Sequence, residues 1–256
     1  MKALIFAAGL GTRLRPITDT MPKALVSIGG HTLLEYQIRK LYRAGVRDII
    51  VNVHHFPDMI IDYLRENAGF GCTIHISDER DELLETGGGL LKAWSRFAAN
   101  EPILALNVDI LSEIDLQEVV RAFEPQELGT LVVKARETQR YLCFDSENKL
   151  VGWTNIATGE LKPSGFHMDE SEYRRLAFSG MQVLGPQVLP LLQAFAQEKG
   201  PKFSVIDFYL YIVERQLGVL RALQLDVPMM DIGKIDHIEE AESFALSYTR
   251  LLTWSR

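Results

Sequence analysis

The strongest chemical signal lies near the start, where a hydrophobic run leads into "GLGTRLRPITDTMPKAL" (9–25). Gly9 and Gly11 allow the backbone to bend sharply and to expose its N–H groups. Arg13 and Lys23 bring positive charge to the same place. Exposed amides beside cations bind anions, so this spacing favours a polyanion such as a chain of phosphates.

Neither of the two common glycine-rich phosphate motifs is complete in this segment. A dinucleotide fingerprint would need a third glycine at position 14, where the chain has Leu14, and a Walker loop would need Gly-Lys-Ser/Thr. The alternative is an ordinary turn between a strand and a helix. The nearby cations Arg13 and Lys23 favour phosphate binding over that alternative.

Two aspartates have the chemistry to hold a metal ion beside those phosphates. Asp109 ends the apolar run "PILALNVD" (102–109), where a buried carboxylate needs a partner. Mg²⁺ takes one or two carboxylates together with substrate phosphates, and Asp231 in "MMDIG" (229–233) is the natural second ligand. The alternative is that each aspartate only caps the turn that follows it.

A second glycine-rich stretch, "LETGGGL" (84–90), precedes a predicted helix. Its glycines permit a flat base to approach the backbone closely. The alternative is a flexible helix N-terminus, where glycine is common.

The elements that must position these residues alternate over the first half of the chain. We predict strands at 2–6, 48–53, 72–77 and 102–107, and helices at 32–45, 56–67, 88–98 and 115–123. This order predicts right-handed βαβ units and an α/β fold with a doubly wound, mostly parallel sheet. Ligands bind at the carboxyl ends of strands in such folds, so the motifs are expected to meet in one crevice.

The second half is less regular. A hairpin formed by "YLCFD" (141–145) and "KLVGW" (149–153) predicts a small antiparallel region, flanked by strands at 130–135 and 176–184. Helices are predicted at 186–196, 204–216 and 236–252. We interpret residues 1–256 as one domain, with a regular first part at about 1–125 and a less regular second part at about 126–256.

Five motifs, in order along the chain, resemble those of the sugar-1-phosphate nucleotidyltransferases. The opening segment resembles the signature G-x-G-T-R-L-x-P-L-T followed by P-K-P, with Ala24 at the last proline. The other four matches are "LETGGGL" (84–90), "NVDI" (107–110), "FSGMQVL" (178–184) and "MDIGKIDHIEEAE" (230–242). The compact length and "LETGGG" are most similar to N-acetylmuramate-1-phosphate uridylyltransferases and to mannose-1-phosphate guanylyltransferases without a C-terminal β-helix.

The resemblance implies a Rossmann-like, GT-A-like fold, a role in nucleotide-sugar synthesis, and a set of site residues. The implied catalytic residues are Arg13, Lys23 and Asp109. The implied nucleotide-binding residues are Ala8, Gly9, Gly11, Thr12, Arg13, Glu85, Thr86, Gly87, Gly88 and Asn107. Phe178, Ser179 and Gly180 are implied to bind the sugar, and Asp109 and Asp231 to bind Mg²⁺.

The chain also departs from the family pattern. Where the family usually has Gly-Asp, this chain has Val108-Asp109. Where the family usually has Asp-x-Gly-Thr, this chain has Lys234 in place of the threonine. The Glu-Lys-Pro segment of many relatives is missing where "GWTN" (152–155) stands, which leaves a second lysine for the sugar phosphate unassigned.

Composition excludes several other classes of protein. The formal net charge of −7 argues against general binding of nucleic acids, which requires a basic face. The two cysteines, Cys72 and Cys143, cannot form a disulfide framework. The first apolar run meets charged residues too early for a signal peptide, and no run approaches the roughly 20 residues that cross a bilayer. We therefore expect a cytoplasmic protein without a membrane partner, as a monomer or a small homo-oligomer.

The leading hypothesis is a Mg²⁺-dependent enzyme that joins a sugar 1-phosphate to a nucleoside triphosphate, with UTP and N-acetylmuramate 1-phosphate as the best guess. The alternatives are a GTP-dependent mannose- or heptose-1-phosphate guanylyltransferase, a cytidylyltransferase for a non-sugar phosphate, and a non-catalytic nucleotide sensor. Val108 and Lys234 motivate the last of these.

Overall fold

The structure is a computed structural model that describes residues 1–96 and 100–249. The chain forms two compact units whose segments alternate along the sequence. Unit 1 contains Met1–Leu83, Ala105–Leu116 and the chain from Val227, and unit 2 contains Leu84–Leu104 and Gln117–Asp226. The division that the sequence places near residue 125 stays a prediction.

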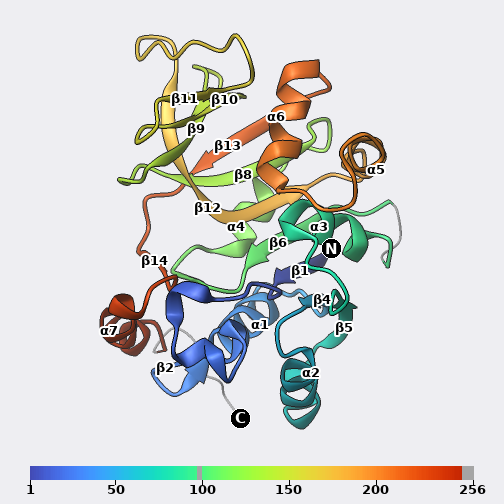
Figure 1. Ribbon diagram of the computed structural model, residues 1–256, viewed down its shortest axis with the longest axis vertical. Coiled ribbons are helices and arrows are strands. Elements are labelled where there is room, and N and C mark those ends of the chain that lie inside the picture. The colour runs from blue at the N-terminus through green and yellow to red at the C-terminus, as the bar shows by residue number, and fades with distance from the viewer. Residues whose placement is uncertain (97–99, 250–256) are drawn as a thin grey trace. The chain divides into compact units, whose positions relative to one another are not determined.

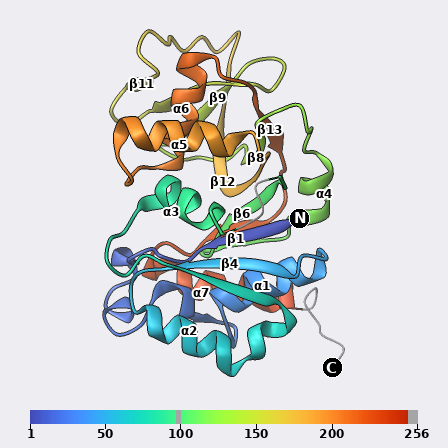
Figure 2. The same cartoon turned by 90° about the vertical axis from the view of Figure 1, so that its right-hand side faces the viewer.

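Unit 1 is built on parallel strands that alternate with helices (Figure 1). The strand β1 (Lys2–Phe6) pairs in parallel with β4 (Asp48–Val53), and β4 pairs in parallel with β5 (Thr73–Asp78). The connecting helices are α1 (Leu33–Arg43) and α2 (Pro57–Glu66). Figures 1 and 2 both place α1, α2 and α7 (Ile238–Thr249) on one side of β1 and β4. These elements confirm the predicted βαβ pattern.

Local sequence explains the start of α1. The hydroxyl of Thr32 accepts a hydrogen bond from the N–H of Glu35 at 3.0 Å, which is one half of a capping box. The Glu35 carboxylate instead binds Arg39, with Nε at 2.6 Å, and the ring of His31 at 3.0 Å. Thr32 therefore caps the helix, while Glu35 links it to its neighbours.

Short antiparallel pairs complete unit 1. These are β2 (Ser27–Ile28) with β3 (His31–Thr32), and β7 (Ile110–Ser112) with β14 (Met229–Asp231). The strand β6 (Ile103–Asn107) contributes residues to both units. Single helical turns lie at Thr12–Leu14, Ile17–Asp19, Lys23–Leu25, Ala68–Gly71 and Ile235–His237.

Unit 2 is mainly antiparallel. Its longest strand, β12 (Arg174–Leu184), pairs with β8 (Gly129–Lys134) and with β9 (Arg140–Phe144). Next to β9 follow β10 (Leu150–Asn155) and β11 (Glu160–Lys162), which confirms the predicted hairpin. The strand β13 (Leu220–Gln224) runs parallel to β8 and was not predicted, because its sequence, Leu-Arg-Ala-Leu-Gln, contains no β-branched or aromatic residue.

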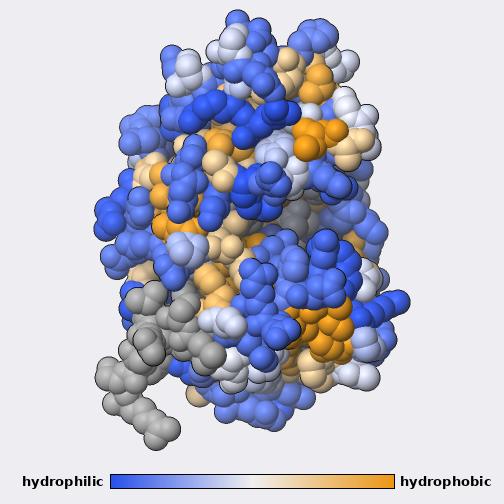
Figure 3. Space-filling model, turned by 90° about the vertical axis from the view of Figure 1, so that its left-hand side faces the viewer, coloured by the Kyte–Doolittle hydropathy of each residue, from blue (hydrophilic) through white to orange (hydrophobic). Residues whose placement is uncertain are grey.

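The helices of unit 2 are α3 (Glu85–Trp94), α4 (Leu116–Arg121), α5 (Val188–Lys199) and α6 (Val205–Arg215). The helix α6 packs against α3, α5 and β10. Ser204 caps α6 by accepting a hydrogen bond from Ile206 N at 3.1 Å. Among the described residues, no helix is long and apolar enough to cross a membrane. The face drawn in Figure 3 is mostly hydrophilic, with apolar residues in separate patches.

Candidate functional site

The glycine-rich segment after β1 presents a row of unused amides. In the described part of the chain, the N–H groups of residues 9–12 have no intramolecular hydrogen-bond acceptor. Gly11 has a φ of 64°, and a Cβ there would lie 2.8 Å from Thr18 Cγ2. The Thr18 hydroxyl donates to Gly11 O at 2.8 Å and holds the bend. Only glycine satisfies both demands at position 11, and the resulting concave row of N–H groups suits an anion.

Asn52, at the end of β4, fixes the base of this segment, and sequence reasoning did not single it out. Its Oδ1 accepts hydrogen bonds from Ala7 N at 2.7 Å and from Ala8 N at 3.3 Å. Its Nδ2 donates to Glu79 Oε1 at 2.8 Å, and both side chains are buried. The only available signal was a polar residue inside the apolar strand 48–53. The predicted binding residue Ala8 therefore already uses its amide for structure.

Lys23 and Asp109 meet in unit 1. The Lys23 ammonium forms an ion pair with Asp109 Oδ2, and only 8 % of Lys23 is exposed. Asp109 lies between β6 and β7, directly before β7 and two residues after the half-buried Asn107. The sequence assigned Lys23 and Asp109 separate roles, whereas the structure joins them.

Asp231 lies beside Asp109 because β14 pairs with β7. Asp231 is in register with Ile110, and Ile232 N donates to Asp109 O at 2.9 Å. A Cβ on Gly233 would lie 2.8 Å from Arg13 Nη2 and 2.8 Å from Asp231 Oδ1. Gly233 therefore leaves room for the guanidinium of Arg13 and the carboxylate of Asp231 at one place.

The donor set of unit 1 fits a magnesium ion that is shared with a ligand. Asp231 on β14 and Asp109, directly before the paired strand β7, supply the hard oxygen atoms that Mg²⁺ prefers. No group of three or more metal-ligating side chains is present in residues 1–96 and 100–249, so the protein alone offers no complete cage. Mg²⁺ normally completes its shell with water and substrate phosphates, which matches this two-carboxylate arrangement.

Lys40 of α1 binds the last residue of β7, Ser112. Its Nζ donates to Ser112 O at 2.7 Å and to Ser112 Oγ at 2.6 Å, and 7 % of the residue is exposed. Burial lowers the pKa of Lys40 from 10.5 to about 7, against the opposing effect of Asp115 and Glu113.

This pKa shift predicts a pH-dependent stability. Between pH 7 and 10.5 the unfolded chain keeps the Lys40 proton while the folded protein loses it, so the free energy of unfolding rises with pH. The slope for one proton is at most about 1.4 kcal/mol per pH unit. Denaturant titrations of the wild type and Lys40→Met across this range check it. We expect the free energy of unfolding of the wild type to rise with pH relative to that of Lys40→Met. A constant difference between the two proteins across this range would contradict the lowered pKa.

The second glycine-rich stretch belongs to unit 2, and its helix begins earlier than predicted. The sequence placed the start of the helix at residue 88, whereas α3 begins at Glu85, so the glycines lie in its first turns. Gly87 N and Gly88 N donate to Phe203 O at 2.9 and 3.2 Å, and Thr86 Oγ1 accepts from Val205 N at 3.0 Å. These two glycine amides therefore donate within the protein, and the assignment of Gly87 and Gly88 to the nucleotide stays a prediction.

Packing requires glycine at position 88. A Cβ there would overlap Pro201 O, so Gly88→Ala is expected to lower stability by about 1–3 kcal/mol. An unhindered helical site would instead gain up to about 1 kcal/mol from alanine. Thermal unfolding measures the sign of the change. A raised melting temperature would show that the 200–204 segment is not packed against α3 in this way.

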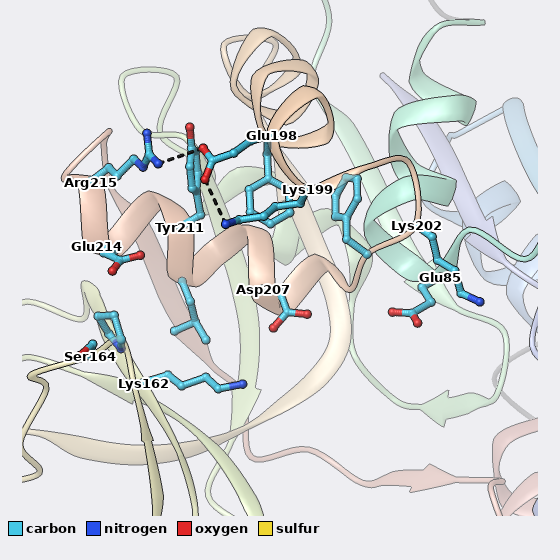
Figure 4. Close-up of a pocket in the computed structure, with 14 residues that line it drawn as sticks. Glu85, Lys162, Ser164, Glu198, Lys199, Lys202, Asp207, Tyr211, Glu214 and Arg215 are labelled. Atoms are coloured by element: carbon cyan, nitrogen blue, oxygen red, sulfur yellow. Dashed lines mark hydrogen bonds and ion pairs between the residues drawn. The ribbon is translucent and has the colours of Figure 1, made fainter.

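Glu85 has an unusual backbone and lines a cavity of unit 2. Its φ is 61°, which is uncommon for a residue with a side chain. The cavity has a volume of about 580 Å³ and is lined by Glu85, Lys162, Pro163, Ser164, Phe195, Glu198, Lys199, Lys202, Phe203, Asp207, Leu210, Tyr211, Glu214 and Arg215 (Figure 4).

Charges of both signs surround this cavity. Glu198 forms ion pairs with Lys199 at 3.0 Å and with Arg215 at 2.9 Å (Figure 4). Lys162 pairs with Glu160 at 3.2 Å, and Lys202 lies between α5 and α6. Lys162 belongs to "ELKP" (160–163), a lysine–proline segment that sequence reasoning missed because it lies beyond "GWTN". Lys162 also lies 5.2 Å from the centre of the Trp153 ring.

The predicted sugar residues lie at an irregular point of β12. Pairing with β8 shifts between Phe178 and Gln182, and Gly180 there has a φ of 67°. Phe178 is half-buried, and the buried Ser179 Oγ has no hydrogen-bond partner in the described part of the chain. A bulge of this kind redirects side chains and is frequent beside binding sites.

A sequence model of the nucleotidyl transferase family matches residues 2–247, almost the whole chain. The chain belongs to this family. An N-acetylmuramate alpha-1-phosphate uridylyltransferase of Caulobacter vibrioides is 31% identical over 192 residues, which cover 73% of this chain and 76% of that protein. The mannose-1-phosphate guanyltransferase beta-B of Xenopus laevis is 32% identical over 240 residues, which cover 91% of this chain and 61% of that protein.

The fold is that of known nucleotidyltransferases. The structure of a UDP-glucose pyrophosphorylase complexed with UDP-glucose matches with a TM-score of 0.75 and 19% identity, covering 96% of this chain and 98% of that one. The predicted family and the α/β fold class are confirmed. Within this nucleotidyl transferase, Val108 occupies the usual glycine position with its side chain buried and its N–H bonded to Phe6 O at 3.1 Å.

Proposed function

We propose that this protein joins a sugar 1-phosphate to the α-phosphate of a nucleoside triphosphate and releases pyrophosphate. The observation that carries the proposal is the convergence in unit 1 of unused amides at residues 9–12 with two cations and two carboxylates. Both substrates are anions, so the protein must cancel their repulsion and align the attacking and leaving groups.

Each candidate site residue of unit 1 has a role in the proposed reaction. The amides of Gly11 and Thr12 hold the β- and γ-phosphates. Arg13 stabilises the departing pyrophosphate with its fork of N–H donors. Lys23, which Asp109 orients, contributes its charge at the α-phosphate and the incoming sugar phosphate. No general base is required, because the sugar phosphate is already ionised.

Asp109 and Asp231 would hold Mg²⁺ in this proposal. The ion would neutralise phosphate charge and act as a template for the triphosphate. The two carboxylates would bind and orient it, and the ammonium of Lys23 also compensates the charge of Asp109.

The remaining predicted residues would contact the organic parts of the substrates. We assign Glu85, Thr86, Gly87, Gly88 and Asn107 to the base and ribose, as the resemblance to the family implies. Phe178, Ser179 and Gly180 are assigned to the sugar. Lys162, which lines the same cavity as Glu85, is our candidate for the second lysine that contacts the sugar phosphate.

UTP and N-acetylmuramate 1-phosphate are the proposed substrates, because the uridylyltransferase from Caulobacter vibrioides aligns over most of both chains. A GTP-dependent mannose-1-phosphate guanylyltransferase is the second candidate, since the Xenopus laevis relative matches 91% of this chain. We place the reaction in the cytoplasm, where nucleoside triphosphates are abundant, and expect a monomer or small homo-oligomer.

A panel assay tests this proposal. Five nucleoside triphosphates are combined with many sugar 1-phosphates, and pyrophosphate release is measured with and without Mg²⁺. We expect release only when a matched pair and the ion are all present. A ligand-induced rise in melting temperature with no release for any pair would instead indicate a nucleotide sensor, for which Val108 and Lys234 are the motivating departures. Release with phosphocholine and CTP alone would indicate the non-sugar alternative.

A further inference from the structure

The backbone around Asp109 is held by two elements distant in sequence. Gln37 of α1 donates through Nε2 to Val108 O at 3.3 Å and to Ile110 O at 2.8 Å. The carbonyl between them, Asp109 O, accepts from Ile232 N at 2.9 Å. A side-chain amide has two N–H hydrogens, and both are used on the carbonyls that flank Asp109.

Gln37 occupies a position that suits an apolar residue. It lies on the buried face of α1, with 1 % of its surface exposed, near Leu34 and Leu41 in the helical repeat. Its Oε1 is buried and has no hydrogen-bond partner in the part of the chain that the structure describes. A half-satisfied buried amide is a poor way to stabilise a core. Its distinctive contribution is the position of the 108–110 backbone.

We propose that Gln37 is a positioning residue for the Asp109 carboxylate and thereby sets the affinity for the divalent cation. The inference rests on the proposed function, because it takes Asp109 as a metal ligand. The side chain of Asp109 is attached to a backbone segment that Gln37 holds through the carbonyls before and after Asp109. The Ile232–Asp109 hydrogen bond fixes the same backbone relative to Asp231. Loss of a group that orients a metal ligand typically weakens metal binding by about 10–100-fold.

Lys40 provides a matched control on the same helix. It lies one turn after Gln37, is buried, and holds the same strand through Ser112, three residues beyond Asp109. Lys40→Met therefore removes a comparable buried tether without touching the carbonyls that flank Asp109.

The test compares the full-length wild type with Gln37→Met, Lys40→Met and Asp109→Asn. Electron paramagnetic resonance measures Mn²⁺ binding, first with Mn²⁺ alone and then with UTP, with no sugar phosphate so that no turnover occurs. Thermal unfolding is measured in parallel. We expect Gln37→Met to weaken Mn²⁺ binding about 10–100-fold, Lys40→Met to leave it unchanged, and Asp109→Asn to weaken it more than Gln37→Met does. Gln37→Asn keeps an amide that cannot reach both carbonyls, and it replaces Gln37→Met if that variant does not fold.

The outcomes separate this inference from the proposed function. Equal Mn²⁺ affinity in the Gln37 variants and the wild type, with binding weakened in Asp109→Asn, would overturn the role of Gln37 alone. The same conclusion follows if Lys40→Met weakens binding as much as Gln37→Met at a similar loss of stability. Unchanged binding in Asp109→Asn, or no binding by the wild type under either condition, would overturn the metal site and the inference with it.

Discussion

Replacing either Asp109 or Asp231 by asparagine is expected to abolish turnover while leaving the protein folded. Asparagine keeps the shape of the side chain and removes the charge that would bind Mg²⁺. A metal ion typically supplies several kcal/mol of charge stabilisation, and each 1.4 kcal/mol corresponds to about tenfold in rate. We therefore expect losses on the order of 10³-fold or more in either single variant, measured as pyrophosphate release per folded molecule.

The double variant distinguishes a shared ion from two independent aspartates. If Asp109 and Asp231 act as one unit, the double variant should be little slower than either single variant, because such effects are not additive. High Mg²⁺ should restore part of the activity of each single variant. Additive effects, lowered melting temperatures and retained turnover per folded molecule would show that the two residues only stabilise their turns.

Arg13→Ala is expected to reduce turnover by about 10²–10³-fold, the usual cost of removing a donor that stabilises charge developing in the transition state. Arg13 is exposed, and its guanidinium lies over Gly233 beside Asp231, so its removal leaves no buried cavity. The binding of the sugar phosphate should change little, because the charge that Arg13 meets belongs to the departing pyrophosphate.

Steady-state kinetics and a separate binding measurement check the Arg13 prediction. Arg15→Ala is a suitable control, since Arg15 is exposed nearby and pairs with Asp19 at 3.2 Å rather than with the aspartate site. We expect Arg15→Ala to have a small effect on turnover. Normal turnover in Arg13→Ala with equally weakened binding of both substrates would show that Arg13 serves only general attraction.

Local sequence was sufficient for most of the elements, and it indicated the residue types of the proposed site. Strands such as 48–53 and helices such as 33–43 follow from β-branched runs, helical periodicity and the Thr32 cap, all of which act over a few neighbouring residues. The glycines and cations of residues 9–23 likewise predict an anion site. The conformational freedom of glycine and the positive charge of arginine and lysine are intrinsic to these residues.

Tertiary structure decided the contacts between segments that lie far apart along the chain. The Lys23–Asp109 ion pair joins residues 86 positions apart, and Gln37 reaches the carbonyls around Asp109 from a helix more than 70 residues earlier. The partners of Gly87 and Gly88 are likewise distant in sequence: both amides donate to Phe203 O, and Phe203 and Pro201 lie where a Cβ would stand. The periodicity of side chains along one element gives no information on such partners, because they depend on which helices and strands pack together in the folded protein.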